Sequence, residues 1–462
     1  MTLLRSWKNG FAPINRIPPE ILCTIPGFFG TRHKDRRTIK LTHVCRAWRE
    51  LFISCPSLWT DLRWKGVEKT QAYLERSKSS PVNVSLSLYG ELSPRHPFFQ
   101  VIPRTTGRLK SLIMHGLPEQ PNDIAGHLSN PEPLLERLEL YGSFTAVPVL
   151  FSGDLSSLRH LQLCKIQTEL PWRNMASLTS VDLEAVSPKI SITHLLDFLE
   201  SAPRLHTVRL IDTASTSGGQ GSRLVSLASL KEMKIGGSTP CAPLLDHLSI
   251  PIGAKLDILP VSLDPSCENL FPRSPGNLRN ISNFTTVSLW FKAAYSRTKF
   301  AGPDGELSMT SGFPQADISM ALGYLVRLGP STIERLSISG GGPPAADVVH
   351  QVLLPMQSLR TLTIYRCENT YTLIRSLSPQ PQPSSVVFCP KLEELVLSLR
   401  RNEEKYAIRH VIRMAESRAS RGAKLKTVQI LKDRRGFDEV DVSKLEKHVL
   451  RVEFGAEAAN ND

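Results

Sequence analysis

The sequence predicts an α/β protein in which a short N-terminal all-α module precedes an irregular α/β solenoid. Three observations predict this class. A short apolar pattern recurs along most of the chain, groups of helix-spaced apolar residues precede several of its copies, and the first 64 residues carry a different, purely helical pattern. Because each repeated unit would bury its apolar face only against its neighbours, the expected architecture is a stack of units rather than one compact domain.

Each copy of the repeat reads apolar-x-x-apolar-x-apolar, and its last three residues alternate as a short strand with one buried face does. The stronger copies begin at Leu135, Leu158, Leu178, Leu205, Leu230, Ile333, Leu359, Leu392 and Leu425. Weaker copies begin at Leu109, Leu245 and Phe284. The intervals are 23, 20, 27 and 25 residues in the first group and 26, 33 and 33 in the second. The short intervals match the period of leucine-rich repeats, and the long ones leave room for helices and loops.

Helical periodicity precedes three of these copies. Ile192, Leu195, Leu196 and Leu199 lie at offsets 0, 3, 4 and 7, and the same spacing recurs from Ile318 and from Ile408. That spacing places the apolar residues on one face of a helix. Helix, loop and parallel strand together predict leucine-rich-repeat-like units, which are degenerate here because no asparagine ladder is present. An ordinary α/β domain is the alternative.

Several segments interrupt the repeats. Residues 213–222, 251–275, 301–316 and 378–385 are rich in glycine, proline or serine and read as loops or linkers. We therefore expect a disordered N-terminus over 1–13, the helical module over 14–64, a solenoid over 65–454 with irregular insertions near 251–316, and a disordered tail over 455–462. The irregular middle is either a break between two solenoid halves or an insertion that carries a binding surface.

Two helices are expected in the module. The run from Ile17 to Leu22, IPPEIL, is a proline-led helix start, which Pro26 and Gly27 stop early. In the second segment the apolar residues lie at offsets 0, 3, 4, 7, 10 and 11 from Leu41, which predicts one amphipathic helix that ends at Cys55-Pro56. So small a unit buries little surface alone, which favours docking to a partner or to the rest of the chain.

The order IPPEIL, VCRAWRELF and CPSLW over residues 14–64 resembles the F-box motif as it occurs in large fungal families. The resemblance implies that the module binds a Skp-type adaptor, which links it to a cullin–RING ubiquitin ligase, while the repeats hold a protein substrate. By the same resemblance, the residues that face the adaptor or the core of the module are Ile17, Pro18, Ile21, Leu22, Val44, Cys45 and Trp48. Leu58 and Trp59 would close the module.

The segment departs from the F-box pattern in two ways. Pro26 stands where the family continues its first helix with a bulky apolar residue, and GFFGTRHKDRR separates the two helices. A second function therefore stays open, in which the chain is a leucine-rich-repeat interaction scaffold with a vestigial F-box and no ligase role.

Other function classes find little support. The net charge of +13 permits nucleic-acid binding, but the basic clusters near Arg32 and Lys432 lack interleaved aromatic residues. The sequence has no phosphate-binding loop, HExxH or GxSxG motif, and its eight cysteines are dispersed. We expect no enzymatic activity, no metal and no cofactor. With no signal peptide or apolar membrane span in the sequence, we expect an intracellular protein in the cytoplasm, the nucleus or both, without a membrane partner.

Overall fold

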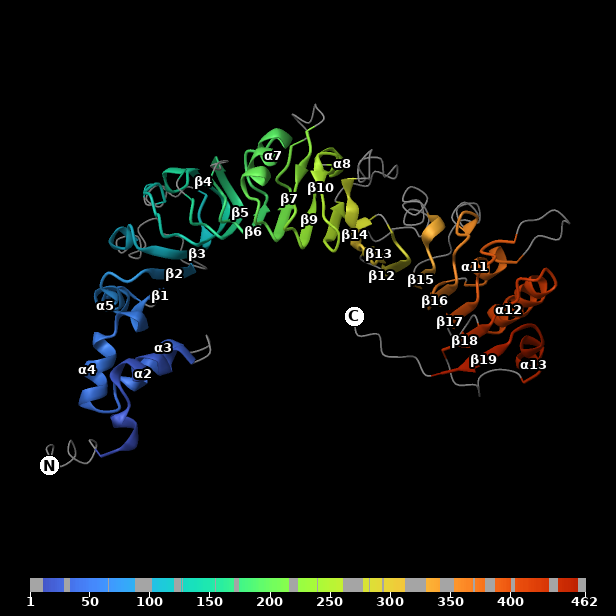
Figure 1. The fold of residues 1–462 in the computed structure, drawn as a ribbon, viewed down its shortest axis with the longest axis horizontal. Helices are drawn as coiled ribbons and strands as arrows, with labels where there is room; N and C mark the ends of the chain where they lie inside the picture. Colours follow the sequence, from blue (N-terminus) through green and yellow to red (C-terminus); the bar gives the residue numbers. More distant parts are fainter. Residues whose placement is uncertain are drawn as a thin grey trace. The chain divides into compact units, whose positions relative to one another are not determined.

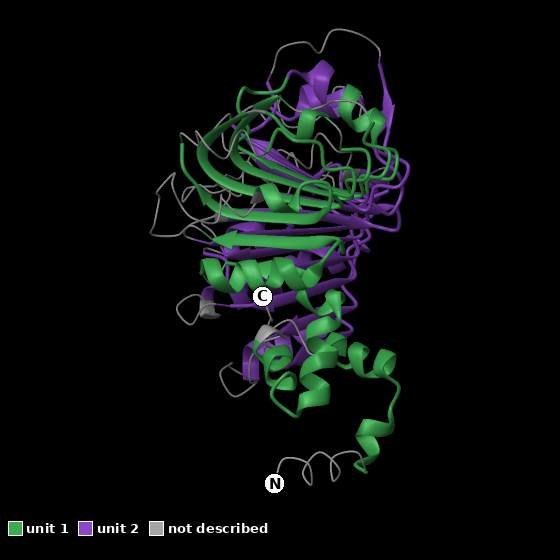
Figure 2. Ribbon diagram, turned by 90° about the vertical axis from the view of Figure 1, so that its left-hand side faces the viewer, with its two compact units in different colours: residues 1–190, 197–205 green, residues 191–196, 206–462 purple. Residues whose placement is uncertain are grey.

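The computed structural model confirms the α/β class, with a helical N-terminal region and strands that dominate the rest. It describes residues 11–455 except for 29–33, 65, 88–101, 120–125, 127, 154, 170–173, 216–222, 239, 261–276, 282, 293–294, 312–329, 341–352, 369, 379–386, 400–403 and 432–438. The chain forms two compact units, which Figure 2 distinguishes by colour. Unit 1 comprises residues 1–190 and 197–205, and unit 2 comprises 191–196 and 206–462.

Unit 1 begins with the helical elements of the module. They are η1 (Pro13–Arg16), α2 (Pro19–Thr24), η2 (Ile25–Phe28), α3 (Lys34–Leu41), α4 (Arg46–Ser54) and η3 (Pro56–Trp59). A short strand, a helix and a second strand follow: β1 (Asp61–Arg63), α5 (Val67–Ser77) and β2 (Val82–Ser87) (Figure 1). Strand β1 pairs with β2 in parallel, so α5 is the crossover between two parallel strands. The parallel repeat pattern therefore starts directly after the module.

The strands of unit 1 follow one another in parallel. After η5 (Ile102–Thr105) come β3 (Leu109–Leu117), β4 (Arg137–Val149), η6 (Phe151–Gly153), β5 (His160–Glu169) and β6 (Ser180–Glu184). Each strand from β2 to β5 pairs with the next one along the chain. Leu138, Leu161 and Val181 are successive register partners, and all three are buried. The predicted strands at these copies are confirmed, and the repeated apolar positions form continuous buried rows.

A buried carboxyl group joins two turns of unit 1. Glu132 is 5% exposed, and its Oε2 accepts hydrogen bonds from the N–H groups of Gly107 at 3.0 Å and Leu109 at 3.2 Å. Burial raises the pKa of Glu132, and the two backbone hydrogen bonds oppose that rise in pKa. Since its pKa is raised in the folded state, the carboxyl group favours folding most when it is protonated. That contribution is lost as the pH rises through the folded-state pKa.

Glu132 therefore gives a testable difference between two substitutions. Glu132→Gln keeps one acceptor oxygen and removes the charge, so we expect it to raise the free energy of unfolding at neutral pH and to remove the local pH dependence. Glu132→Ala removes the acceptor of the exposed Gly107 N–H and of the buried Leu109 N–H, and the loss at Leu109 should cost about 1–3 kcal/mol. Urea unfolding at acidic and neutral pH measures both. A Gln variant less stable than the parent at neutral pH would contradict the argument.

Unit 2 continues the same pattern with one interruption. Its strands are β7 (Thr207–Ile211), β8 (Val225–Ser226), β9 (Glu232–Gly237), β10 (Leu248–Ser249), β11 (Lys255–Pro260), β12 (Thr286–Lys292), β13 (Tyr295–Gly302), β14 (Gly305–Ser311), β15 (Arg335–Gly340), β16 (Thr361–Tyr365), β17 (Glu394–Ser398), β18 (Thr427–Ile430) and β19 (Arg451–Phe454). Parallel pairing joins β7, β9 and β11, and also joins β15 to β19 in order. The stronger copies at Leu205, Leu230, Ile333, Leu359, Leu392 and Leu425 thus all lead into strands, as predicted.

The interruption is a three-stranded insertion. Strand β14 pairs in parallel with β11, β12 pairs in parallel with β15, and β13 runs antiparallel between β12 and β14. The interpretation of 301–316 as a loop is wrong for its described part, since β13 extends to Gly302 and β14 begins at Gly305. The dipeptide Pro303-Asp304 forms the turn of this hairpin. Gly305 has φ +147° and a Cβ there would lie 2.7 Å from the Ala254 carbonyl oxygen, which explains the glycine.

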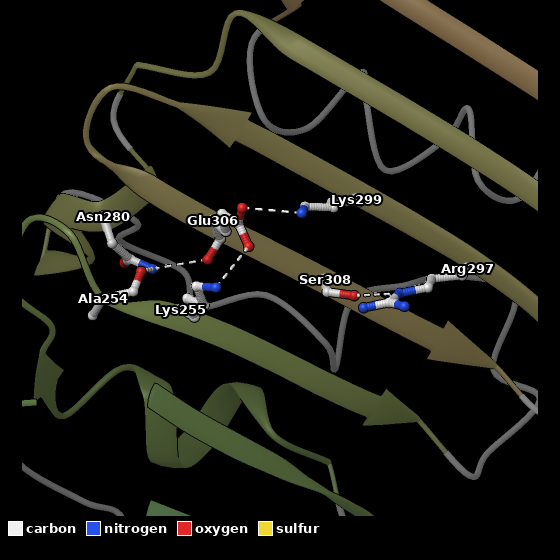
Figure 3. Close-up of polar contacts among 7 residues, drawn as sticks. All are labelled: Ala254, Lys255, Asn280, Arg297, Lys299, Glu306 and Ser308. Carbon is white, nitrogen blue, oxygen red and sulfur yellow. Dashed lines mark hydrogen bonds and ion pairs between the residues drawn. The ribbon is translucent and has the colours of Figure 1, made fainter. Parts of the chain in front are cut away.

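Polar side chains hold the insertion to β11, as Figure 3 shows. Asn280 is fully buried and its Nδ2 donates to the carbonyl oxygens of Ala254 at 3.2 Å and Glu306 at 3.4 Å. The Glu306 carboxylate lies 3.0 Å from Lys299 Nζ and 3.8 Å from Lys255 Nζ. Arg297 Nε donates to Ser308 Oγ at 3.0 Å. These contacts cross from β11 to β14 and from β14 to β13, so they fix the order of the inserted strands.

Helix α7 (Ile192–Ser201) has residues in both units. The remaining helical elements lie in unit 2 and are α8 (Ala242–Leu245), η8 (Arg279–Ile281), η9 (Pro330–Thr332), α11 (Thr370–Ser376), α12 (Glu404–Ala419) and α13 (Glu439–His448). The helices predicted from Ile192 and Ile408 are confirmed, whereas the one predicted from Ile318 lies outside the described residues. Within the described ranges, no helix has the length and apolar character needed to cross a membrane.

Candidate functional site

The candidate site is the N-terminal helical module, because all nine residues singled out from the sequence lie there. Its core is formed by Leu22 of α2 with Trp48 and Phe52 of α4. Half-buried apolar side chains pack around these three: Ile17, Ile25, Leu41, Cys45, Leu51 and Leu58. The module thus has a small hydrophobic core of its own, to which both predicted helices contribute.

Trp48 is the centre of this core. Its ring lies edge-on to Phe52, with centroids 5.4 Å apart, and the Trp48 indole Nε1 donates to Asn15 Oδ1 at 2.6 Å. A buried indole N–H without a partner would be costly, so this hydrogen bond fixes the segment before α2 against α4. Asn15 was not predicted as a site residue, and its position two residues before IPPEIL is the only signal in the sequence that points to it.

The single helix predicted from Leu41 to Phe52 is wrong in its first half. Helix α3 ends at Leu41, α4 begins only at Arg46, and Cys45 is the extended residue before it. Thr42 Oγ1 donates to the Ile39 carbonyl oxygen at 2.7 Å, a local bond that competes with helix continuation. Arg49 Nε of α4 donates to the Thr42 carbonyl oxygen at 3.2 Å and so satisfies a backbone acceptor at the break. Val44 therefore lies in a turn rather than on a helix face.

The nine predicted residues fall into three groups of exposure. Buried in a core are Leu22, Trp48 and Trp59. Half-buried against the core are Ile17, Cys45 and Leu58. Exposed to solvent are Pro18, Ile21 and Val44. Ile21 and Leu22 lie on different faces of α2, since Ile21 is 54% exposed while Leu22 is 4% exposed.

Exposed apolar side chains concentrate in this module. Of the sixteen large apolar side chains that are exposed among the described residues, five lie between residues 11 and 44: Phe11, Ile14, Ile21, Phe28 and Val44. Phe28, just after Pro26, is 86% exposed, and Val44 is 58% exposed. Soluble chains rarely leave so many large apolar groups exposed within one small unit unless a partner covers them. The arrangement can therefore bind an apolar protein surface.

Trp59 is buried between the end of the module and α5. Its ring is edge-on to Tyr73 of α5 at 4.9 Å, and the Arg76 guanidinium lies 4.4 Å from its centroid. Its indole Nε1 donates to the Phe52 carbonyl oxygen at 2.9 Å. Trp59 thus joins the end of α4 to the first helix of the repeats. The helical spacing of Thr70, Tyr73 and Leu74, unused in the sequence prediction, would have revealed α5.

Cys23 of the module has a thiol of low reactivity. Burial, together with a hydrogen bond to the Cys55 side chain, raises the pKa of Cys23 to about 12, so its thiol stays protonated at neutral pH. A protonated thiol is a poor nucleophile and a poor metal ligand. Among the described residues, no group of three His, Cys, Asp or Glu side chains is placed to hold a metal ion. The features of the module that could support binding are its exposed apolar side chains.

Comparison with known proteins adds little to this picture. No protein-family model matches the chain, and a search of curated proteins finds no match. Among solved structures, the chain is similar to a leucine-rich-repeat protein of Leptospira interrogans, with 13% sequence identity over 85% of this chain and 99% of that one. The TM-score of that superposition is 0.30, a value at which a shared fold is not shown.

Proposed function

We propose that this chain is a binding protein without catalytic activity, in which the helical module docks on a Skp-type adaptor and the repeats hold a protein substrate for a cullin–RING ubiquitin ligase. The observation that carries the proposal is the group of exposed apolar side chains around a proline-led helix, above a core built by Leu22 and Trp48. The resemblance of residues 14–64 to an F-box supplies the identity of the partner. In this proposal the chain contributes to ubiquitin transfer only by holding the substrate near the ubiquitin donor of the ligase.

The exposure pattern distinguishes docking residues from core residues. In this proposal Pro18, Ile21 and Val44 contact the adaptor directly, while Leu22 and Trp48 keep the module folded. Phe28 extends the apolar surface beyond the point where Pro26 ends the α-helical hydrogen-bond pattern. The short first helix was the reason to consider a vestigial F-box. In this proposal the exposed apolar side chains still provide a docking surface despite that short helix.

The test is co-purification of the full chain with a tagged Skp-type adaptor from the same organism. We expect the parent chain to co-purify and the double variant Ile21→Asp with Val44→Asp to fall to background. Each exposed apolar side chain buried in an interface contributes about 1.5–3 kcal/mol, so the pair should change affinity by a factor of about one hundred or more. A matched control is Ile252→Asp with Val440→Asp in unit 2, where both residues are similarly exposed.

The outcomes separate the two functions. If the parent chain co-purifies and only the module variant is lost, adaptor docking is supported. If the correctly folded parent chain does not co-purify, the chain is instead an interaction scaffold with a vestigial module. Circular dichroism of both variants shows whether a loss reflects docking or unfolding.

A further inference from the structure

Helices α11 and α12 of unit 2 together present an unusual group of side chains to solvent. The two helices pack against each other, and Tyr371 of α11 stacks on His410 of α12 with ring centroids 5.6 Å apart. Arg375 lies one helical turn after Tyr371, and Arg413 lies nearly one turn after His410. Arg413 and Arg375 both lower the pKa of His410, so each lies within electrostatic range of its imidazole.

The same face of α12 continues in both directions. Tyr406, Arg409, His410 and Arg413 lie at offsets 0, 3, 4 and 7, which is one stripe along a helix. Tyr406 is 66% exposed, both arginines are exposed, and the opposite stripe is buried through Ala407, Ile408, Val411, Met414 and Ala415. We call Tyr371, Arg375, Tyr406, Arg409, His410 and Arg413 the α11–α12 basic face.

The three arginines of the basic face make no ion pair with an acidic side chain among the described residues. Elsewhere in unit 2 lysines pair with acids, as Lys299 does with Glu306 and Lys426 with Glu393. For Arg375, Arg409 and Arg413, no such ion pair or hydrogen bond exists among the described residues. Burial, followed by Arg413 and Arg375, lowers the pKa of His410, so its imidazole is neutral at neutral pH. Arginines gathered without an ion-pair partner repel one another, and binding of an anion would relieve that repulsion.

We propose that the α11–α12 basic face binds an acidic segment of a protein partner, whose Asp or Glu carboxylates pair with Arg375, Arg409 and Arg413. Guanidinium groups match carboxylates in geometry and bind them through two parallel hydrogen bonds. Tyr406 and Tyr371 supply apolar ring surface for the aliphatic parts of the segment. The inference rests on the proposed role of the repeats in holding a protein, but not on adaptor docking, and its test needs no adaptor.

The extent of the basic face favours a peptide over a nucleic acid. On α12 the stripe ends at Glu416, which is exposed three residues after Arg413. Helix α13, which packs against α12, begins with Glu439 and Asp441 in its first turn. The stripe therefore covers about two turns of α12, from Tyr406 to Arg413. A nucleic-acid site would need a longer basic track, because its affinity depends on neutralising many phosphates in a row.

The test is fluorescence anisotropy of a labelled octaglutamate peptide with the full chain at low ionic strength. We expect binding by the parent chain and a loss of about tenfold or more in affinity for Arg375→Glu with Arg413→Glu, since two charge-assisted contacts become repulsive. The matched control is Lys391→Glu with Lys424→Glu. Both lysines are exposed in unit 2, and their reversal changes the net charge by the same amount. The control should stay within about twofold of the parent chain.

Two further probes complete the experiment. Labelled octaglutamine, which has the same length without charge, should not bind. Labelled oligouridylate of matched charge should bind more weakly than octaglutamate. The proposal is overturned if the parent chain does not bind octaglutamate, if both double variants weaken binding equally, or if oligouridylate binds more tightly through the same arginines. Thermal unfolding of both variants shows that they are folded, so a binding loss is assigned to the surface.

Discussion

Replacing Arg418 with alanine is expected to lower the free energy of unfolding of the C-terminal repeats by about 3–5 kcal/mol, the range for breaking a buried polar contact and opening a cavity together. Arg418 lies in the last turns of α12 and is fully buried. Its guanidinium donates to the carbonyl oxygens of Phe388 at 2.7 Å and Cys389 at 2.9 Å. Burial lowers the pKa of Arg418 because removal from water disfavours the charged guanidinium.

The two carbonyl groups explain why a charged residue is kept in this place. Cys389 has φ +46°, so the chain turns sharply just before the repeat that contains β17, and its carbonyl cannot join a strand ladder. Without Arg418, the Phe388 and Cys389 carbonyls lose these two hydrogen bonds, although the Cys389 carbonyl still accepts one from the Leu392 N–H at 3.0 Å. The loss of hydrogen bonding should cost about 1–3 kcal/mol in all. Arg418 therefore connects α12 to the turn that precedes β17, one repeat earlier in the chain.

Two further substitutions separate the hydrogen bonds from the packing. Arg418→Met restores most of the buried volume but neither hydrogen bond, so it should be destabilised by about 2–4 kcal/mol. Arg418→Lys keeps the charge and at most one of the two bonds. Hydrogen-exchange mass spectrometry of peptides from β17 and β18 measures the local opening, which is appropriate because repeats can unfold in parts. A methionine variant as protected as the parent chain would show that the carbonyl contacts do not matter.

The strands could be predicted from the sequence because one pattern decides them. In copies such as the one at Leu359, the alternation of Leu362 and Ile364 with polar residues requires one buried face, and the structure buries both. The same reasoning missed β11 and the hairpin of β13 and β14. There the alternation is present, but glycine and proline nearby favoured a loop, although a Pro-Asp-Gly run is itself a turn signal for a hairpin.

The sequence identified the residues of the candidate site but not the helix boundaries and exposures that they have in the structure. Periodicity cannot show where a helix breaks, and the break between Leu41 and Arg46 depends on a side-chain bond from Thr42 and on Arg49, which lies on the following helix. That break moved Val44 from a helix face to an exposed turn. The α11–α12 basic face was not predicted, because Tyr371 and His410 are far apart in the sequence and only packing of the two helices brings them together.

Replacing Trp59 with alanine is expected to be the most damaging single change in unit 1, at about 3–5 kcal/mol, the usual range for removing a buried tryptophan. Trp59 is fully buried and bridges two elements, through its edge-on contact with Tyr73 and its hydrogen bond to the Phe52 carbonyl oxygen. Losing it removes the packing between the end of α4 and α5. We expect amide hydrogen exchange in both helices to accelerate together, with the repeats of unit 2 unchanged.

Trp59→Phe and Arg76→Ala identify which contact of Trp59 matters most. Phenylalanine keeps an aromatic ring near Tyr73 but leaves the Phe52 carbonyl without its donor, so it should cost less than alanine and more than about 1 kcal/mol. Arg76→Ala removes only the cation–π contact, which contributes about 0.5–1 kcal/mol at an accessible position. Trp290→Ala, at a half-buried position on β12, is the matched control and should affect only unit 2. If Trp59→Ala accelerates exchange in α4 but not in α5, the two elements fold independently and Trp59 does not couple the module to the repeats.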